Sequence, residues 1–278
     1  MIELPESYVL AEQINENLVG KTIKKAEANT FSHGFAWYSG DPAEYAKKLK
    51  GQTIISANPG TVFTTEGHTE IVLNDWFLLF TTALKYHFSA ETLPKKHQFL
   101  AEFTDGTFLS STVQMYGRLG CEPIGSEKWN NGGNALFFSD DFDEQYFEKL
   151  VATINPKESV KALLATKQRI PGLGNGVLQD ILFNCEIHPK TRLSSLKDSD
   201  IQNLFNSMKN TMTNMRDKGG RDTETLLFGE KGEYKTIFSN KAMSKDCPNC
   251  GGQKEREAFL GGNIYFCPVC QKLEKVIG

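Results

Sequence analysis

Four of the six cysteines form two close pairs, and their spacing predicts the clearest chemistry in the chain. The pairs are Cys247-Pro-Asn-Cys250 and Cys267-Pro-Val-Cys270, with sixteen residues between them. Each pair can offer two thiolates to one ion, and the segment between the pairs is long enough for a β-hairpin. Four thiolates in a tetrahedron predict one structural zinc ion. An iron–sulfur centre and a chance spacing are the alternatives.

A glycine-rich turn lies in the middle of the C-terminal half. Pro171-Gly-Leu-Gly-Asn175 reads as a tight turn, because the two glycines can take positive φ and the proline fixes φ on entry. Asn175 can cap a following helix, expected at 176–184. The helix is expected to end before His188-Pro189. Bare N–H groups at such a helix start can bind an anion such as phosphate, although a plain helical hairpin is the commoner explanation.

The elements that position these residues follow from the hydrophobic pattern. A leading helix begins at Leu4-Pro5-Glu6 and ends at Gly20. Short strands separated by turn residues are expected next, and helical periodicity resumes after residue 143. The expected strands are 22–28, 52–57, 70–73, 77–81, 99–103 and 107–113. The expected later helices are 146–154, 160–165, 176–184 and 198–215. Residues 129–134 read as a linker or long loop. The pattern predicts a β-sandwich with a leading helix, followed by a helical domain.

Composition and charge narrow the classes of protein. The chain has 278 residues, 39% hydrophobic and 23% charged, as in a soluble globular protein. No signal peptide and no apolar run long enough for a bilayer is evident, so we expect a cytoplasmic protein without membrane contact. Residues 1–150 hold 12 basic against 20 acidic residues, net −8, and residues 151–278 hold 19 against 14, net +5. This asymmetry favours a phosphate-binding C-terminal half.

The motifs together resemble those of the formamidopyrimidine-DNA glycosylase/endonuclease VIII (Fpg/Nei) family. GLGN, a helix ending in Leu-Phe, and then Ile-His-Pro match its helix–two-turn–helix motif, while the cysteine pairs match its zinc finger. The N-terminal and mid-chain segments fit in the same order, so the resemblance covers nearly the whole chain. It implies an α+β protein with three parts. These are a β-sandwich with a leading helix at 1–135, a helical DNA-binding domain at 136–225, and a zinc finger at 226–278.

The resemblance also implies roles for residues at the N-terminus. The family begins Pro-Glu-Leu-Pro-Glu after methionine removal, and its proline amine attacks the sugar C1′ to form a Schiff base. Here Ile2 replaces that proline, and we expect Met1 to be retained, with its amine about 3.8 Å, one residue, from the expected point. Glu3 then corresponds to the general acid/base and Glu6 to a supporting residue. Two solvated carboxylates at a helix start are the alternative.

Further positions correspond to DNA contacts in the family. Asn175, with Gly174 beside it, is implied to contact the phosphate that flanks the lesion. Other matching positions are Lys96, His97, Arg118 and Arg221. For Lys96 and Arg118, an exposed surface charge is the ordinary alternative.

Three positions depart from the family. The arginine expected at the finger tip corresponds to Gly262. The lysine expected in an early strand loop has no clear counterpart in 64–68. Of two expected arginines, only Arg118 remains.

The resulting hypothesis is a monomeric DNA-repair protein that binds damaged duplex DNA. It resembles a bifunctional DNA glycosylase/AP lyase, which flips a damaged base out of the helix, excises it and then cuts at the abasic site. Its chemistry is altered by Ile2. A non-catalytic protein that binds damaged DNA is the first alternative, and an RNA-binding zinc-finger protein is the second. The sequence does not name the lesion.

Overall fold

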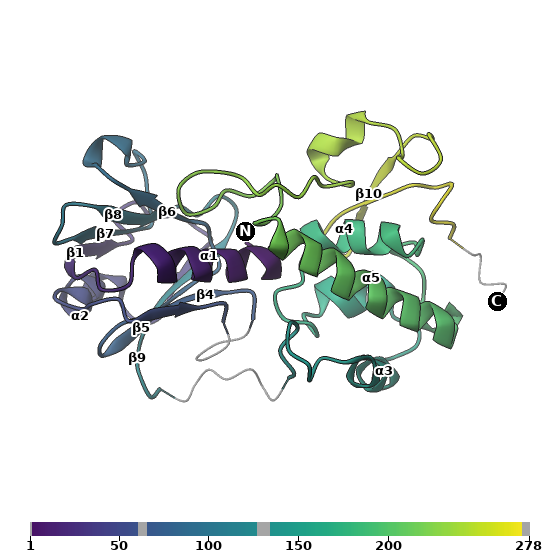
Figure 1. Cartoon of the computed structure of the whole chain (residues 1–278), viewed down its shortest axis with the longest axis horizontal. Helices are drawn as coiled ribbons and strands as arrows, with labels where there is room; N and C mark the ends of the chain where they lie inside the picture. Colours follow the sequence, from purple (N-terminus) through teal and green to yellow (C-terminus); the bar gives the residue numbers. More distant parts are fainter. Residues whose placement is uncertain (1, 61–65, 127–133, 274–278) are drawn as a thin grey trace. The chain divides into compact units, whose positions relative to one another are not determined.

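The computed structural model describes residues 2–60, 66–126 and 134–273 of the chain. Its contacts divide the chain into two compact units (Figure 1). The first comprises 1–133 together with 224–232, and the second comprises 134–223 together with 233–278. The sequence predicted three domains. The division into two units does not separate the zinc finger from the helical domain, so the zinc finger as a domain of its own remains a prediction. The expected linker at 129–134 falls mainly outside the described residues.

The leading helix α1 spans Leu4–Asn17 and is buried along one side. Pro5 occupies its first turn, where the missing N–H costs nothing, and Glu6 favours the positive end of the helix dipole. Leu10 and Ile14 are fully buried in the core, as the three- and four-residue spacing predicts. The helix therefore anchors its N-terminal turn against the sandwich.

Two sheets form the β-sandwich of the first unit. The four-stranded sheet is antiparallel, in the order β1 (Ile23–Ala28), β7 (Phe99–Phe103), β8 (Phe108–Ser111) and β6 (Leu84–His87). The five-stranded sheet has the order β2 (Ala36–Tyr38), β9 (Gly117–Pro123), β5 (Trp76–Phe80), β4 (Thr69–Val72) and β3 (Ser56–Asn58). Only its β2–β9 pair is parallel. Phe80 and Phe99 join the two sheets edge to face, with ring centroids 5.1 Å apart.

Several sandwich elements were not expected from sequence. Strands β2, β6 and β9 are short or contain glycine and proline, so they lack a clear alternating pattern. The predicted strand at 52–57 shortens to β3, because only its end pairs with β4. Residues 224–232 return to this unit, where the Leu227 carbonyl accepts a 2.7 Å hydrogen bond from the Tyr86 amide. Short helical elements complete it: η1 (Pro42–Glu44), α2 (Tyr45–Leu49) and η2 (Ala90–Thr92).

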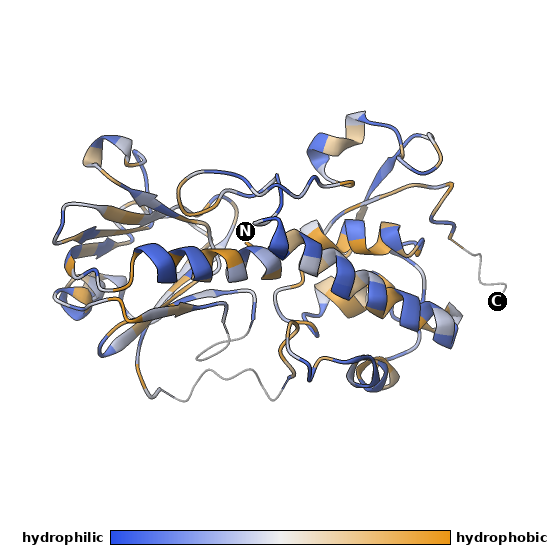
Figure 2. Ribbon diagram, in the orientation of Figure 1, coloured by the Kyte–Doolittle hydropathy of each residue, from blue (hydrophilic) through white to orange (hydrophobic). Residues whose placement is uncertain are grey.

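The second unit is helical and ends in a β-hairpin. Its elements are α3 (Glu144–Ala152), the π-helical segment η3 (Ala162–Thr166), α4 (Asn175–Asn184), η4 (Leu193–Ser195), α5 (Asp198–Asp217), η5 (Asn240–Ser244), β10 (Glu255–Phe259) and β11 (Gly262–Phe266). Helix α4 is the central element, because every residue from Val177 to Phe183 is buried. Helix α5 carries many more hydrophilic residues (Figure 2). The observed architecture confirms the predicted α+β fold.

Among the described residues, no helix combines the length and the apolar character needed to cross a membrane.

Candidate functional site

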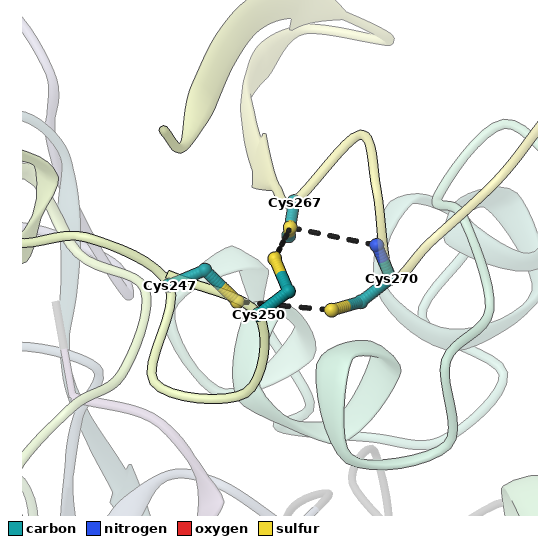
Figure 3. A group of neighbouring side chains, drawn as sticks. All are labelled: Cys247, Cys250, Cys267 and Cys270. Carbon is teal, nitrogen blue, oxygen red and sulfur yellow. Dashed lines mark hydrogen bonds between the residues drawn. The ribbon is translucent and has the colours of Figure 1, made fainter. Parts of the chain in front are cut away.

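The four paired cysteines converge on one point (Figure 3). Their sulfur atoms all lie within 4.8 Å of one another. The Cys247 and Cys270 sulfurs are 3.8 Å apart, and those of Cys250 and Cys267 are 3.4 Å apart. Four thiolates bound tetrahedrally at about 2.3 Å from zinc would lie roughly 3.8 Å from each other. The donor set and its spacing therefore fit one four-coordinate metal ion.

Backbone amides around the cysteines favour thiolates. The Gly252 N–H donates to the Cys250 sulfur at 3.4 Å, and the Cys270 N–H donates to the Cys267 sulfur at 3.5 Å. Burial alone would raise the pKa of Cys247, but hydrogen bonds from backbone groups at 249 and 250 and from the Cys267 and Cys250 side chains bring it down to about 7. Burial and the neighbouring thiols raise the pKa values of Cys267 and Cys270, so all four thiolates form together only when a cation is bound. This arrangement is suited to a cation that neutralises clustered thiolates.

The hairpin that joins the cysteine pairs packs on α4. Gln179 of α4 donates to the Asn263 carbonyl at 3.2 Å and accepts from the Tyr265 amide at 3.1 Å. The rings of Phe183 and Phe238 lie 4.8 Å apart in a cluster that includes two of the cysteines. The metal centre therefore holds β11 against the helix that begins at the glycine turn.

The glycine turn differs from the sequence expectation in two details. Gly172 has φ +75°, but Gly174 has φ −112° and serves as the N-cap of α4. Asn175 is accordingly the first helical residue, and the prediction that it caps the helix is wrong. Its side chain is left exposed at the helix start and remains available for contacts outside the turn.

Asn175 lies directly against the finger hairpin. A Cβ placed on Gly262 would meet Nδ2 of Asn175 at 2.8 Å and Nζ of Lys161 at 3.6 Å. These three residues come from α4, β11 and the segment before η3, and they converge at one place in the second unit. Sequence reasoning singled out Asn175 and Gly262 separately, but it did not find Lys161.

Lys161 is a buried cation. Its side chain has no exposed surface, and its Nζ donates to the Phe259 carbonyl. Among the residues that the structure describes, no carboxylate forms an ion pair with it. Burial lowers its pKa, as expected when the charged form loses water. An uncompensated positive charge beside Asn175 favours an anion at this point.

The predicted catalytic residues lie at the start of α1. Glu3 is the N-cap residue, and its backbone N–H donates to a Glu6 carboxylate oxygen at 3.3 Å in a capping box. Glu6 is fully buried, and Glu3 is 8% exposed. Ile2 packs into the sandwich core with 3% exposure, and Met1 lies outside the described residues. Glu6 thus fixes the backbone from which Glu3 projects.

A second group of polar residues in the first unit was missed from sequence. The Tyr8 hydroxyl, five residues after Glu3, donates to the buried Glu66 carboxylate at 2.6 Å. Burial lowers the pKa of the nearby His68 to about 4, and the positive charge of Arg118 adds to this effect. His68 is therefore neutral at neutral pH. Arg118, a predicted DNA contact, is partly buried, and burial also lowers its pKa.

Lys96 and His97 differ in accessibility. Lys96 is exposed, but His97 is 8% exposed, and its Nε2 lies 2.8 Å from the Glu27 carboxylate. Lys96 is free to meet a phosphate, whereas His97 is held within the first unit. DNA contact by either residue remains a prediction.

Arg221 is one of the largest fully buried side chains of the second unit, with 2% exposure. It lies near Asp180, and its backbone forms an isolated parallel β-bridge with that of Tyr234. The two Asp180 carboxylate oxygens accept the amides of Ile237 and Phe238 at 2.9 and 2.8 Å. Burial raises the pKa of Asp180 to about 6, although these hydrogen bonds and Arg221 act in the opposite direction. The observed surroundings of Arg221 are those of a buried polar network.

Comparison with known proteins agrees with this architecture. The family model for the formamidopyrimidine-DNA glycosylase H2TH domain matches residues 134–225. The formamidopyrimidine-DNA glycosylase of Lactobacillus gasseri is 27% identical over 289 residues, covering 99% of this chain and 100% of the relative. The Bacillus subtilis protein of the same name is 27% identical over 280 residues, covering 98% and 99%.

Solved structures of Lactococcus lactis Fpg share the fold. A complex with abasic-site DNA has a TM-score of 0.74 at 21% identity, and a complex with THF-DNA and an inhibitor has 0.76 at 22%. Each covers 98% of this chain and 100% of the other. The H2TH match, the full-length relatives and the shared fold make the chain similar to proteins of the Fpg/Nei family over nearly its whole length. It has isoleucine at the position that this similarity gives to the family's N-terminal proline.

Proposed function

We propose that this protein is a DNA-repair glycosylase that binds damaged duplex DNA and excises a flipped damaged base. Full-length similarity to proteins named formamidopyrimidine-DNA glycosylase supports this proposal. The solved structures with the same fold include complexes with abasic-site DNA and with Fapy-dG DNA. The observation that carries the proposal is the position of Glu3, held at the start of α1 by the buried Glu6.

Glu3 is proposed as the general acid/base at the sugar. Its carboxylate takes a proton from water while the water oxygen attacks C1′ and the bond from C1′ to the damaged base breaks. The electron pair of that bond leaves with the base, which is then protonated. Glu6 has a positioning role, because it binds the Glu3 backbone N–H.

Strand cleavage at the abasic site is proposed to be weak. A Schiff base needs an amine held about 3–3.5 Å from C1′, and the family uses a proline whose ring fixes the direction of attack. Ile2 has no such ring, and its side chain packs in the sandwich core. The Met1 amine is the other candidate nucleophile.

We further propose zinc as the metal and phosphate contacts through the second unit. Asn175 and Gly174 lie at the start of α4, next to the uncompensated charge of Lys161. Lys96, His97, Arg118 and Arg221 are the other proposed DNA-binding residues, and Lys96 is the most accessible of them. The protein is proposed to act as a monomer and to lie in the cytoplasm.

A damaged-DNA-binding protein without catalysis is the second candidate. The buried isoleucine at position 2 favours it, because the family's covalent chemistry depends on the residue at that position. The two candidates share the same DNA contacts and differ in whether Glu3 does chemistry.

Two assays separate the candidates. Release of the base from Fapy-dG duplex is measured for the wild type and for Glu3→Gln, together with binding to abasic duplex. We expect release by the wild type, a loss of at least about 100-fold in Glu3→Gln, and nearly equal binding. Binding without release would support the non-catalytic candidate.

Borohydride trapping on abasic DNA tests the nucleophile, and we expect little trapped complex. Efficient trapping that is lost on N-terminal acetylation would assign the chemistry to the Met1 amine.

A further inference from the structure

A cavity of about 460 Å³ opens on the second unit. Neither Asn175 nor any of the four paired cysteines is among the residues that line it. It lies between the segment before η3, the residues that follow α4, and the tip of the finger hairpin. Its volume falls within the roughly 300–1,000 Å³ typical of small-ligand pockets. Its charged lining residues are Lys157, Glu158, Lys167, Lys190 and Arg192, and Phe259 and Leu260 form an apolar wall.

Two of these charges are neutralised inside the unit. Glu158 receives a two-pronged hydrogen bond from Arg169, at 2.8 and 3.1 Å, and this pairing lowers the pKa of Glu158. Lys190 forms an ion pair with Glu257 of β10. Neither pair adds net charge to the cavity.

Three cations of the lining lie outside these ion pairs. Lys157, Lys167 and Arg192 are exposed, and no ion pair forms at any of them within the described part of the chain. An antiparallel bridge between Ser159 and Arg192 fixes the backbone at this side of the cavity. Three positive charges around one concave surface favour a dianionic group such as a phosphate monoester.

The finger hairpin supplies the apolar wall of the cavity. Nζ of Lys161 and Nζ of Lys190 lie 5.9 and 5.4 Å from the centroid of the Phe259 ring, so cation–π contacts hold the ring in place. Leu260 is 44% exposed and adopts φ +47°, a strained conformation for leucine that is fixed by the tight hairpin turn. A phosphate alone would leave this wall uncovered.

We propose that this cavity is a nucleotide-binding site, which takes the phosphate of an unpaired nucleotide on Lys157, Lys167 and Arg192. The base then covers Phe259 and Leu260, because aromatic and apolar side chains stack on an unpaired base without regard to its sequence. A nucleotide inside a duplex cannot bind in this way, since its base is stacked. The site therefore favours a strand end or a gap, beyond the damaged-base chemistry proposed above.

Calorimetric titration of the full, metal-loaded chain tests this proposal in the absence of damaged DNA, so that failure of the glycosylase proposal leaves the result unaffected. The probes are thymidine 5′-monophosphate, thymidine, inorganic phosphate, and a 5′-phosphorylated thymidine tetranucleotide. We expect the monophosphate to bind more tightly than thymidine or phosphate. We expect the tetranucleotide to bind at least as tightly as the monophosphate.

Two variants separate the halves of the site. Lys167→Glu should weaken the monophosphate at least about tenfold, whereas Lys149→Glu, the same change at an exposed position of α3, should have little effect. Leu260→Asn replaces one of the two apolar wall residues with a residue that tolerates positive φ, so it should weaken binding of the monophosphate several-fold and leave phosphate binding unchanged.

The proposal is overturned if the monophosphate does not bind, or if it binds no better than inorganic phosphate. Equal losses in Lys167→Glu and Lys149→Glu would also overturn it. Binding of the free monophosphate but not of the tetranucleotide would reject a strand as the source.

Discussion

The side-chain amide of Asn175 occupies the space into which a side chain at position 262 would project. A Cβ at Gly262 would lie 2.8 Å from Asn175 Nδ2, closer than real Cβ contacts allow. The residue at the start of α4 and the residue at the start of β11 are therefore coupled. Any side chain at position 262 would require the terminal amide of Asn175, the flexible end of that side chain, to move.

The first prediction tests this coupling. Gly262→Arg should weaken binding to abasic duplex about tenfold, as should Asn175→Ala, because both changes would remove the phosphate contact that we propose for the Asn175 side chain. Asn263→Arg adds the same charge at the next, exposed position without the Cβ conflict, and it should bind at least as well as the wild type. Fluorescence anisotropy at fixed salt measures all three. Tighter binding by Gly262→Arg than by the wild type would show that Asn175 moves aside without loss.

The second prediction concerns Glu6. Glu6→Ala removes the acceptor for the Glu3 backbone N–H and should lower the free energy of unfolding by about 1–2 kcal/mol. Glu6→Gln keeps an acceptor and should lose less. Base release should fall more than DNA affinity, because Glu3 loses its fixed position. Urea unfolding and base release are the measurements, with Glu12→Ala, an exposed site on α1, as the control. Identical behaviour of Glu6→Ala and Glu12→Ala would remove the positioning role.

Local sequence signals predicted the parts of the structure that depend on nearby residues. The cysteine spacing predicted a hairpin between two knuckles, and β10 and β11 form it. The glycine turn predicted a helix within one residue of the observed start of α4. In both cases, the residues that decide the conformation lie within a few positions of each other along the chain.

Contacts between distant segments were beyond the reach of sequence patterns. Tyr8 and Glu66 are 58 residues apart, and no periodicity links a tyrosine on a helix to a glutamate before a strand. Arg221 follows two glycines, and no local pattern predicts its burial, yet it is buried near Asp180. Strand β9 contains two glycines and a proline, and it forms a strand because β5 and β2 pair with it on both sides.

The third prediction concerns the metal. Elemental analysis should find one zinc per chain, and a chelator should release it, as should acid, because protons compete for the thiolates. Release of the metal should loosen the hairpin from α4. Hydrogen exchange should therefore become faster at the Tyr265 amide, which donates a hydrogen bond to the Gln179 side-chain oxygen. The Phe103 amide of the sandwich, bonded to the Thr107 carbonyl, should exchange as before. Iron in place of zinc, or an unchanged Tyr265 amide after release, would contradict this prediction.

The fourth prediction is a pH dependence of stability from His188. Burial lowers the pKa of His188 to about 4, and Lys190 adds to this; its Nδ1 accepts the Lys190 amide at 3.1 Å. Below pH 6.5, His188 of the unfolded chain takes up a proton, whereas His188 of the folded chain does so only near pH 4. Stability is therefore fully present above about pH 6.5 and is lost as the pH falls toward 4, by at most about 3 kcal/mol.

The measurement is urea unfolding between pH 4 and 7.5 for the wild type and His188→Asn. Asparagine keeps an acceptor for the Lys190 amide but does not titrate, so the variant should show a flatter dependence in this range. Metal release at low pH affects both proteins, and the comparison between them removes it. Parallel curves for the two proteins would exclude His188 as a source of the slope.

The last prediction concerns Asp180, whose two carboxylate oxygens each accept one backbone amide, from Ile237 and from Phe238. Asp180→Asn keeps the size of the side chain but replaces one acceptor with an NH2 group, which faces a backbone N–H. One buried amide then loses its partner, and Arg221 loses a neighbouring negative charge. We expect a loss of about 2–4 kcal/mol in the free energy of unfolding.

Asp222→Asn is the control. The Asp222 side chain accepts hydrogen bonds from the amide and the hydroxyl of Thr236 at the same oxygen, and asparagine supplies that oxygen. Its loss should be below about 1 kcal/mol. Equal losses in the two variants would show that the paired amides at 237 and 238 do not depend on a second carboxylate oxygen.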